Sequence, residues 1–462
     1  MAVSALKIVE RNEDTHMQRL NTLAPCAAVV LSLVLAAPVG AQAAPVANEQ
    51  FIPIVSYRVG PYAAAGTSVF GGFIDYLNLV NIRDGGINGV KIIWEECETS
   101  YTVDKGVPCY EKLKNHPPTG ASMFTFYSTA ITYAVLDRAG VDKVPLVSIV
   151  HGRTDASDGR VFPYVFPLVT NYWSADTDII KFIGMRMGGM DQLKGKKIVH
   201  LYLDVAYGKE PNEIFMKQAA LYGFQGKLIP VPPPGTDQQS QWLEIRQFQP
   251  DYVVVTGYGV MNPAMLKAAA RANYPRDHII GNFWTGSEED TIPAGEAAVD
   301  YISALVNPAG TDFKVIQDIE KYLYAKGLGN MTDKSLIGSV LYNRGIMTGI
   351  ISVEAIRTAQ GKYGKKPLTG EQIRWGLENL NLDEKRIEAL GAAGLIQPLK
   401  VTCLDHEGGG AVKFQQWDGK KWKIISGWIQ PDRKLVREMV EASAAQYAKE
   451  KGITPRDCSK GG

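Results

Sequence analysis

Apolar and polar residues follow two different periods along the chain between residue 51 and residue 155. Runs of mostly apolar residues, such as 90–96 and 144–150, are typical of strands. Between such runs lie segments with apolar residues at helical spacing, for example Phe70, Phe73 and Leu77 within 68–84. Strands that alternate with helices predict a parallel sheet with helices on both faces.

A second series of the same kind starts near residue 172. We expect its helices over 173–189, 210–223 and 262–274, and its strands over 196–204, 225–234, 249–259 and 278–284. Single hydrophobic cores stop growing at about 250–300 residues, and the chain has 462. The fold class is therefore predicted as α/β, with two doubly wound lobes.

The last third of the chain has a different pattern. A long apolar helix is expected over 336–360, which is either buried within a lobe or partly a dimer face. A helix over 369–380 has a threonine at its start, and the segment 413–429 is typical of a hairpin with Asp418-Gly419 at its turn.

The N-terminal segment has the pattern of a secretory leader. Lys7, Arg11 and Arg19 precede an apolar run over 27–37, and the small residues 41–43 follow it. A basic stretch, a short apolar run and a small-residue site predict a signal peptide over 1–43, cleaved near Ala43. An uncleaved anchor is the alternative. Export would place the mature protein in the periplasm.

The cysteines agree with an oxidising compartment. Cys26 lies within the predicted leader, which leaves Cys97, Cys109, Cys403 and Cys458. We expect the pairs with the shortest loops, Cys97–Cys109 and Cys403–Cys458, although four free thiols are the alternative. The cysteines lack metal-ligand spacing, so no metal is expected.

Charge and motifs narrow the function class. Lys+Arg 49 against Asp+Glu 48 leaves a formal net charge of +1, which gives no reason to expect nucleic acid as a partner. The sequence contains no GxSxG, P-loop, GxGxxG or HExxH motif. We expect no cofactor and no enzymatic activity, while a triad assembled only in space, as in a hydrolase, stays open.

An ordered set of segments resembles the solute-binding proteins of ABC importers for branched-chain amino acids and related compounds. The set comprises DGGINGVKIIWEE at 84–96, FYSTAITYAVLD at 126–137, VPLVSIVHGRTD at 144–155, AYGKEPNEIF at 206–215 and VTGYG at 255–259. The resemblance implies a type I periplasmic binding protein, with two α/β lobes joined by three crossovers and a ligand cleft between them.

The resemblance also implies limits for the lobes. Lobe one would comprise 49–168 and about 299–400, and lobe two 169–298 and about 401–435. A C-terminal helix and tail would occupy 436–462.

The implied function is that of an extracytoplasmic receptor of an ABC importer. It would capture a small organic solute by two-lobe closure and deliver the solute to an ABC permease in the inner membrane, as a monomer. A sensor that presents its closed state to a membrane kinase would have the same fold and is the alternative.

Loops at the carboxyl ends of the strands supply the candidate ligand contacts. In the family, the positions that match Ser128 and Thr129 hold a ligand carboxylate at a helix N-terminus, where free N–H groups favour anions. Simple N-capping is the alternative. Further candidates are the loop residues and aromatic side chains Tyr127, His151, Gly152, Arg153, Thr154, Tyr207, Tyr258 and Trp284.

Two features of these loops bear on the ligand. Arg153 offers a planar fork for a carboxylate, unless it forms a salt bridge with Asp155 or Asp158. Amino-acid binders have an acidic residue shortly after the turn at Tyr258, and none stands there. The acids 288–290 could substitute for it, although a solvated loop is the simpler interpretation. We therefore expect an aromatic or hydrophobic carboxylate, and keep an amino acid as the alternative.

Overall fold

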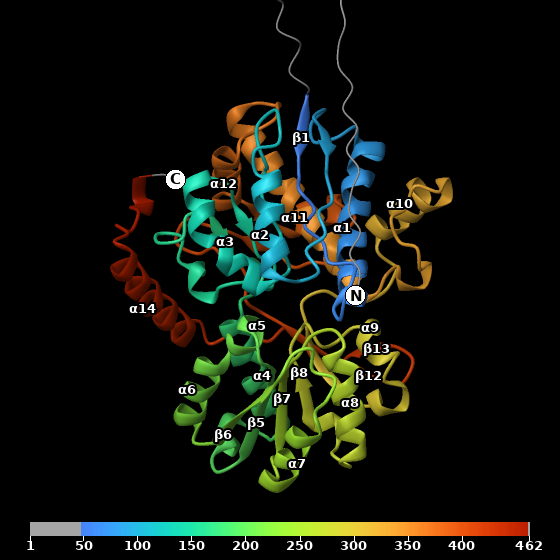
Figure 1. Ribbon diagram of the computed structural model, residues 1–462, viewed down its shortest axis with the longest axis vertical. Helices are drawn as coiled ribbons and strands as arrows, with labels where there is room; N and C mark the ends of the chain where they lie inside the picture. The colour runs from blue at the N-terminus through green and yellow to red at the C-terminus, as the bar shows by residue number, and fades with distance from the viewer. Residues whose placement is uncertain (1–47, 461–462) are drawn as a thin grey trace, which may run out of the picture. The chain divides into compact units, whose positions relative to one another are not determined.

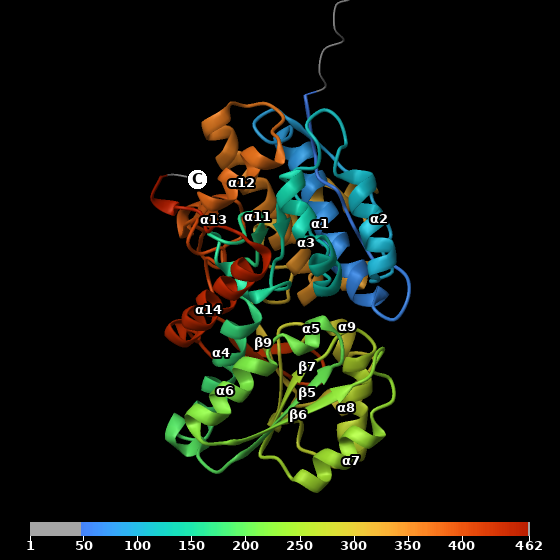
Figure 2. The same cartoon turned by 60° about the vertical axis from the view of Figure 1, so that its left-hand side comes forward.

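The computed structural model describes residues 48–460, so the predicted leader lies outside the described residues. Figures 1 and 2 show the helices and strands gathered into two groups, one above the other. The first lobe holds α1–α3 and α10–α13, and the second lobe holds α4–α9 and the large sheet. Within this range, no helix combines the length and apolarity needed to cross a bilayer.

The second lobe is built on a seven-stranded sheet in the order β13-β12-β9-β8-β7-β5-β6. Strands β5 to β9 are parallel to their neighbours, whereas β12 is antiparallel to β9 and to β13. The strands are β5 (Lys197–Leu203), β6 (Gln225–Val231), β7 (Tyr252–Thr256), β8 (Ile279–Gly281), β9 (Ile302–Leu305), β12 (Lys413–Trp417) and β13 (Trp422–Ile424). The predicted hairpin over 413–429 is the pair β12–β13.

Helices cover both faces of this sheet, as the nearly continuous apolar strands predict. In both views α4 and α6 lie on one side of β5–β7, and α7 and α8 lie on the other (Figures 1 and 2). The helices are α4 (Tyr172–Arg186), α5 (Ala206–Lys209), α6 (Asn212–Tyr222), α7 (Gln239–Phe248), α8 (Met261–Arg271) and α9 (Glu288–Thr291). Strand β5 lies between β6 and β7, so the strand order reverses at β5. In open α/β sheets, ligands bind beside the carboxyl ends of the strands at such a point.

The first lobe has shorter strands. Strand β1 (Glu49–Phe51) is parallel to β2 (Lys91–Ile93), β3 (Leu146–Val147) is parallel to β4 (Val165–Phe166), and β10 (Asn381–Leu382) is antiparallel to β11 (Leu399–Lys400). The segment 121–127 contains a single bridge, between Phe124 and Leu146. This segment still connects β1 to β3, because Ser122 N donates to Phe51 O and Phe124 N to Pro145 O.

Seven helices complete the first lobe. They are α1 (Ala63–Asp84), α2 (Val103–Leu113), α3 (Thr129–Asp142), α10 (Lys314–Tyr322), α11 (Val340–Tyr363), α12 (Gly370–Glu378) and α13 (Glu384–Ala389). The long apolar helix α11 is buried within this lobe against α1 and α12. Glycine allows the close approach of α1 and α11, because a Cβ on Gly345 would lie 2.0 Å from Val69 O.

The chain crosses between the lobes three times, at 167–171, 306–313 and 401–412. The first and third crossings are hydrogen-bonded to each other, since Val169 N donates to Glu407 O (3.0 Å) and Gly410 N donates to Val169 O (2.6 Å). Strand β9 pairs with β8 and β12 in the second lobe. We therefore propose to begin the second part of lobe one after Leu305, rather than near residue 299.

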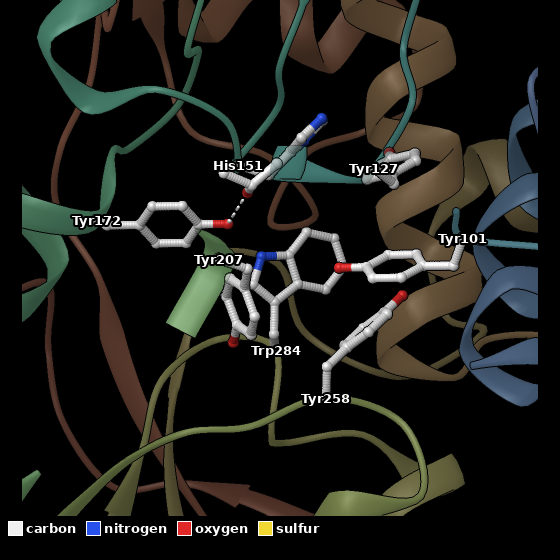
Figure 3. Close-up of a pocket in the computed structure, with 8 residues that line it drawn as sticks. Tyr101, Tyr127, His151, Tyr172, Tyr207, Tyr258 and Trp284 are labelled. Carbon is white, nitrogen blue, oxygen red and sulfur yellow. Dashed lines mark hydrogen bonds between the residues drawn. The ribbon is translucent and has the colours of Figure 1, made fainter. Parts of the chain in front are cut away.

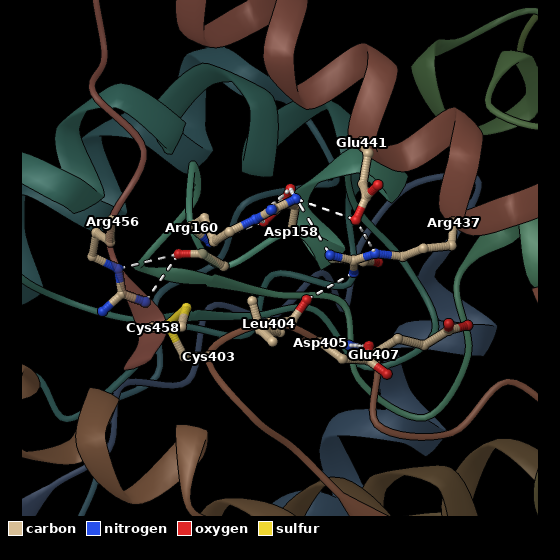
Figure 4. Close-up of polar contacts among 12 residues, drawn as sticks. Asp158, Arg160, Cys403, Leu404, Asp405, Glu407, Arg437, Glu441, Arg456 and Cys458 are labelled. Carbon is tan, nitrogen blue, oxygen red and sulfur yellow. Dashed lines mark hydrogen bonds and ion pairs between the residues drawn. A yellow bond between two sulfur atoms is a disulfide. The ribbon is translucent and has the colours of Figure 1, made fainter. Parts of the chain in front are cut away.

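The last helix, α14 (Arg433–Lys451), packs against the 154–157 turn of the first lobe and against α4 of the second. The tail after it is joined to the third crossing by Cys403–Cys458 and to the first lobe by Arg456, which donates to Gly159 O at 2.9 Å (Figure 4). Cys97–Cys109 forms the other disulfide. The predicted cysteine pairing is therefore confirmed.

Candidate functional site

A small cavity lies where the two lobes meet. Four of its lining residues come from the first lobe and four from the second. The lining residues are Tyr101, Tyr127, Thr129, His151, Tyr172, Tyr207, Tyr258 and Trp284. Figure 3 shows the tyrosine rings gathered around the indole of Trp284. The cavity has a volume of about 10 Å³, which is enough for roughly one water molecule.

Loops at strand ends and one helix start place these side chains. Tyr207 follows β5, Tyr258 follows β7 and Trp284 follows β8, all at the carboxyl edge of the second lobe's sheet. On the first-lobe side, Tyr101 and Tyr127 have positive φ values of 63° and 50°. Non-glycine residues rarely adopt this left-handed conformation, which is concentrated at functional sites.

The N-terminus of α3 points its first turn at the cavity. Ser128 is the N-cap, because its side chain accepts a hydrogen bond from Ile131 N (3.4 Å). Thr129 lines the cavity and its hydroxyl lies 3.4 Å from the hydroxyl of Tyr172. Ser128 therefore caps α3. Thr129 is the first residue of the helix, and its hydroxyl lies beside the N–H groups of the first turn, which have no partner within the helix.

His151 lines the cavity and has one unprotonated ring nitrogen. Its Nδ1 lies 2.9 Å from Ile149 O, and since a carbonyl only accepts, Nδ1 carries the proton. Its Nε2 is buried without a hydrogen-bond partner. Burial lowers the pKa of His151 to about 4, so the ring is neutral at pH 7 and Nε2 is an acceptor.

Hydrogen bonds around the cavity join the two lobes. The hydroxyls of Tyr57 in the first lobe and Tyr258 in the second lie 2.6 Å apart. Trp284 Nε1 donates to Val150 O across the boundary at 2.8 Å. The lobes therefore touch directly, in an arrangement closed around the cavity.

The loop after β3 separates from the cavity beyond His151. Arg153 forms a bidentate pair with Asp155 (2.6 and 2.9 Å) and lies over the ring of Tyr447. Thr154 donates to Glu210 at 2.7 Å. Gly152, Arg153 and Thr154 do not line the cavity, and neither does Ser128. The salt-bridge alternative for Arg153 is the one that the structure contains.

The acids at 288–290 do not form a solvated loop, which corrects the simpler interpretation of the sequence. They form the short helix α9, where Glu288 accepts from Val340 N and Glu289 from the hydroxyl of Ser339, both at 2.9 Å. Asp290 accepts from Asn262 (2.9 Å). Burial raises the pKa of Glu288 to about 8 and that of Asp290 to about 7. None of the three lines the cavity.

Six of the ten predicted ligand contacts therefore surround one cavity: Tyr127, Thr129, His151, Tyr207, Tyr258 and Trp284. Sequence reasoning missed Tyr101 and Tyr172. Tyr172 was detectable, because it begins the first helix after the first crossing. Tyr101 lies in the loop between β2 and α2, so the rule of loops after strands could also have singled it out. Among residues 48–460, no group of three or more His, Cys, Asp or Glu side chains is arranged to hold a metal.

Comparisons with known proteins agree with this architecture. The family model described as "Periplasmic binding protein" matches residues 49–421. A crystal structure described as an ABC transporter permease from the Pseudomonas fluorescens group is 47% identical, with a TM-score of 0.84, and the match covers 89% of this chain and 99% of that one. A search of curated proteins gives no match.

Two more distant structures share the fold. A branched-chain amino acid ABC transporter protein from Thermus thermophilus with bound valine is 20% identical, with a TM-score of 0.71 over 84% of this chain and 98% of that one. A solute-binding protein from R. palustris in complex with benzoate is 18% identical, with a TM-score of 0.63 over 83% and 97%. This chain therefore belongs to the periplasmic binding protein family and has its type I α/β fold.

Proposed function

We propose that the protein captures a small organic solute in the cavity between its lobes and delivers it to an ABC permease of the inner membrane. The observation that carries this proposal is the origin of the cavity wall, four residues from each lobe. A solute held there contacts both lobes at once, and therefore stabilises the closed arrangement over an open one. Substrate-binding proteins of this family are typically periplasmic, which agrees with the predicted leader.

The wall favours an aromatic or hydrophobic carboxylate. Tyr101, Tyr207, Tyr258 and Trp284 offer ring faces and edges to a flat apolar body. The N-terminus of α3 with the Thr129 hydroxyl would receive a carboxylate. No Asp or Glu lines the cavity, so the ammonium group of an amino acid would find no carboxylate partner.

His151 adds a polar requirement to this wall. Its unpaired Nε2 would accept a hydrogen bond from a hydroxyl or N–H group of the solute. An aromatic acid with a ring hydroxyl meets both requirements, because it presents a carboxylate to α3 and a donor to His151.

Binding requires the cavity to expand. Small-molecule sites usually enclose about 300–1,000 Å³, whereas this cavity holds about 10 Å³. The solute must therefore enter while the lobes are apart, and the rings around Trp284 must shift as the lobes close on it. The hydrogen bonds Tyr57–Tyr258 and Trp284–Val150 would break on opening and re-form on closure.

A thermal-shift screen on the chain from Ala44 onward, followed by titration calorimetry, tests this function. The panel contains benzoate-like and cinnamate-like acids with and without ring hydroxyls, branched-chain and aromatic amino acids, small amides and urea. A solute at 100 times its Kd should add about 2.7 kcal/mol to the free energy of unfolding. We expect aromatic acids to stabilise the protein. Stabilisation by amino acids alone would contradict the proposed ligand class.

A matched pair of tryptophan variants locates the site. Trp284→Phe removes the donor to Val150 O and part of the cavity wall. Trp375→Phe is the control, because Trp375 lies on α12 against Tyr363 and away from the cavity. We expect weaker binding only in Trp284→Phe. Equal affinities in the two variants would show that the solute binds elsewhere.

A further inference from the structure

A fully buried arginine lies behind the cavity wall. Arg344 stands in the first turns of α11, between Tyr342 and Ile346, and 0% of its surface is exposed. It is the largest of the fully buried side chains in the described part of the chain. Burying a guanidinium is costly unless the charge is compensated, so the surroundings of Arg344 indicate what compensates it.

The described protein compensates this charge only in part. Arg344 Nη1 donates to Phe283 O at 2.6 Å and Nε donates to Asn307 Oδ1 at 3.1 Å. Nη2 is buried without any hydrogen-bond partner. The guanidinium carbon lies 4.5 Å from the ring centroid of Trp284, which lines the cavity. The guanidinium of Arg344 therefore contacts two uncharged oxygen atoms and the face of one aromatic ring.

No carboxylate within residues 48–460 forms an ion pair with this guanidinium. The acid that interacts with it at longer range, Asp290, already accepts hydrogen bonds from Asn262 and Ser287. Burial lowers the pKa of Arg344 to about 10, so the side chain keeps its positive charge at neutral pH. A charge that is buried and not neutralised raises the electrostatic potential around it.

The cavity lies within reach of this potential. Tyr127, Tyr207 and Tyr258, all of which line the cavity, belong to the surroundings of Arg344. Tyr127 is also linked to it through Thr348, whose hydroxyl contacts Tyr127 and donates to Arg344 O at 3.0 Å. The cavity wall itself contains no acidic side chain.

We propose that Arg344 is the charge-selecting residue of the site, and that it favours solutes with a net negative charge over neutral and zwitterionic solutes of the same shape. This inference rests on the proposed function, because it names the charge of the solute held in the same cavity. Arg153 is not suited to this role, since Asp155 already neutralises it outside the cavity. Arg344 acts through Trp284 and through the local potential, and reaches the solute directly where the Trp284 ring shifts.

Charge-matched ligands test the inference on the unmodified protein. Benzoate, benzamide and phenylalanine share an aromatic ring and differ in charge, being anionic, neutral and zwitterionic at pH 7. We expect calorimetry to give benzoate a Kd about tenfold or more below that of benzamide, because hydrogen bonds and pairs with charged groups are the stronger ones. Equal affinities for benzoate and benzamide would overturn the inference and the proposed preference for a carboxylate, and would leave intact the proposal that the two lobes capture an organic solute. Binding of no organic solute of any charge would overturn both.

Variants test whether Arg344 causes the preference for benzoate over benzamide. In Arg344→Gln the ratio of benzoate to benzamide affinity should fall toward one, while Arg344→Lys should retain part of it and Arg153→Gln all of it. The ratio is informative even where both affinities fall. An unchanged ratio in Arg344→Gln, or a ratio lost in Arg153→Gln instead, would overturn the inference. If Arg344→Gln does not fold, Arg344→Lys decides: a reduced ratio supports the inference, and an unchanged ratio overturns it.

Discussion

Glu288 is expected to make the stability of the folded protein depend on pH. It lies on α9 of the second lobe, and its Oε2 accepts a hydrogen bond from Val340 N, the first residue of α11 in the first lobe. Burial, with smaller contributions from the charges of Glu289 and Asp290, raises the pKa of this carboxyl to about 8, while the N–H of Val340 opposes the shift. The perturbation that isolates this group is Glu288→Gln, which keeps the shape and an acceptor but cannot ionise.

The sign and size follow from linkage. The carboxyl of Glu288 has an ordinary pKa of 4.5 in the unfolded chain and about 8 in the folded protein. Its contribution is complete below pH 4.5 and is lost as the pH rises through 8, because the unfolded chain gives up its proton first. At 1.36 kcal/mol per pH unit the limit is about 5 kcal/mol, and solvent access to the side chain reduces the expected value to about 2–4 kcal/mol.

Urea denaturation at pH 5 and at pH 9 measures this contribution. At pH 5 the unmodified protein and Glu288→Gln should have nearly equal free energies of unfolding. At pH 9 the variant should be more stable by about 2–4 kcal/mol. Glu213→Gln is the control, since the side chain of Glu213 on α6 is 63% exposed. A difference between the unmodified protein and Glu288→Gln that stays constant from pH 5 to pH 9 would refute the reasoning.

Three further changes have expected outcomes in urea or thermal unfolding. Gly345→Ala should lower the free energy of unfolding by about 2–4 kcal/mol, because the new Cβ would lie 2.0 Å from Val69 O. Gly361→Ala is the control in the same helix, where the Cβ has open space, and it should raise the free energy of unfolding by about 0.5–1 kcal/mol. Replacing both cysteines of Cys403–Cys458 by serine should cost about 4 kcal/mol, from the closure of a loop with a sequence separation of 55. Tyr258→Phe should lower the free energy of unfolding by about 1–3 kcal/mol, because the buried hydroxyl of Tyr57 loses its partner at 2.6 Å. An unchanged unfolding midpoint would contradict each of these expected losses.

Much of the fold was predictable because it depends on local patterns. The apolar runs at 197–203 and 252–256 became β5 and β7, and the Asp418-Gly419 turn became the hairpin β12–β13. The short-loop cysteine pairs also formed. Each of these features rests on residues that are close in sequence or on a period that the chain repeats. The apolar segment 121–127, by contrast, forms only a single bridge at Phe124, because pairing depends on neighbours that are distant in sequence.

The candidate site was predictable only in part. The loops after strands that were singled out do meet, because Tyr127, Thr129, His151, Tyr207, Tyr258 and Trp284 all line one cavity. The direction in which a side chain points within a loop was not predictable. Arg153 was therefore a candidate, although it pairs with Asp155 outside the cavity. The acids 288–290 look like a solvated run in sequence, yet they contact the N-terminus of α11.

The sequence by itself determined the α/β class, the two lobes and the resemblance to solute-binding proteins, because alternating periods and ordered loop motifs are properties of the linear chain. Only the tertiary structure brought Arg344 of α11 behind Trp284 of the loop after β8, 60 residues earlier in the chain, without an acid to neutralise it. Charge compensation is decided in space, since it depends on which groups from distant elements meet inside a buried volume.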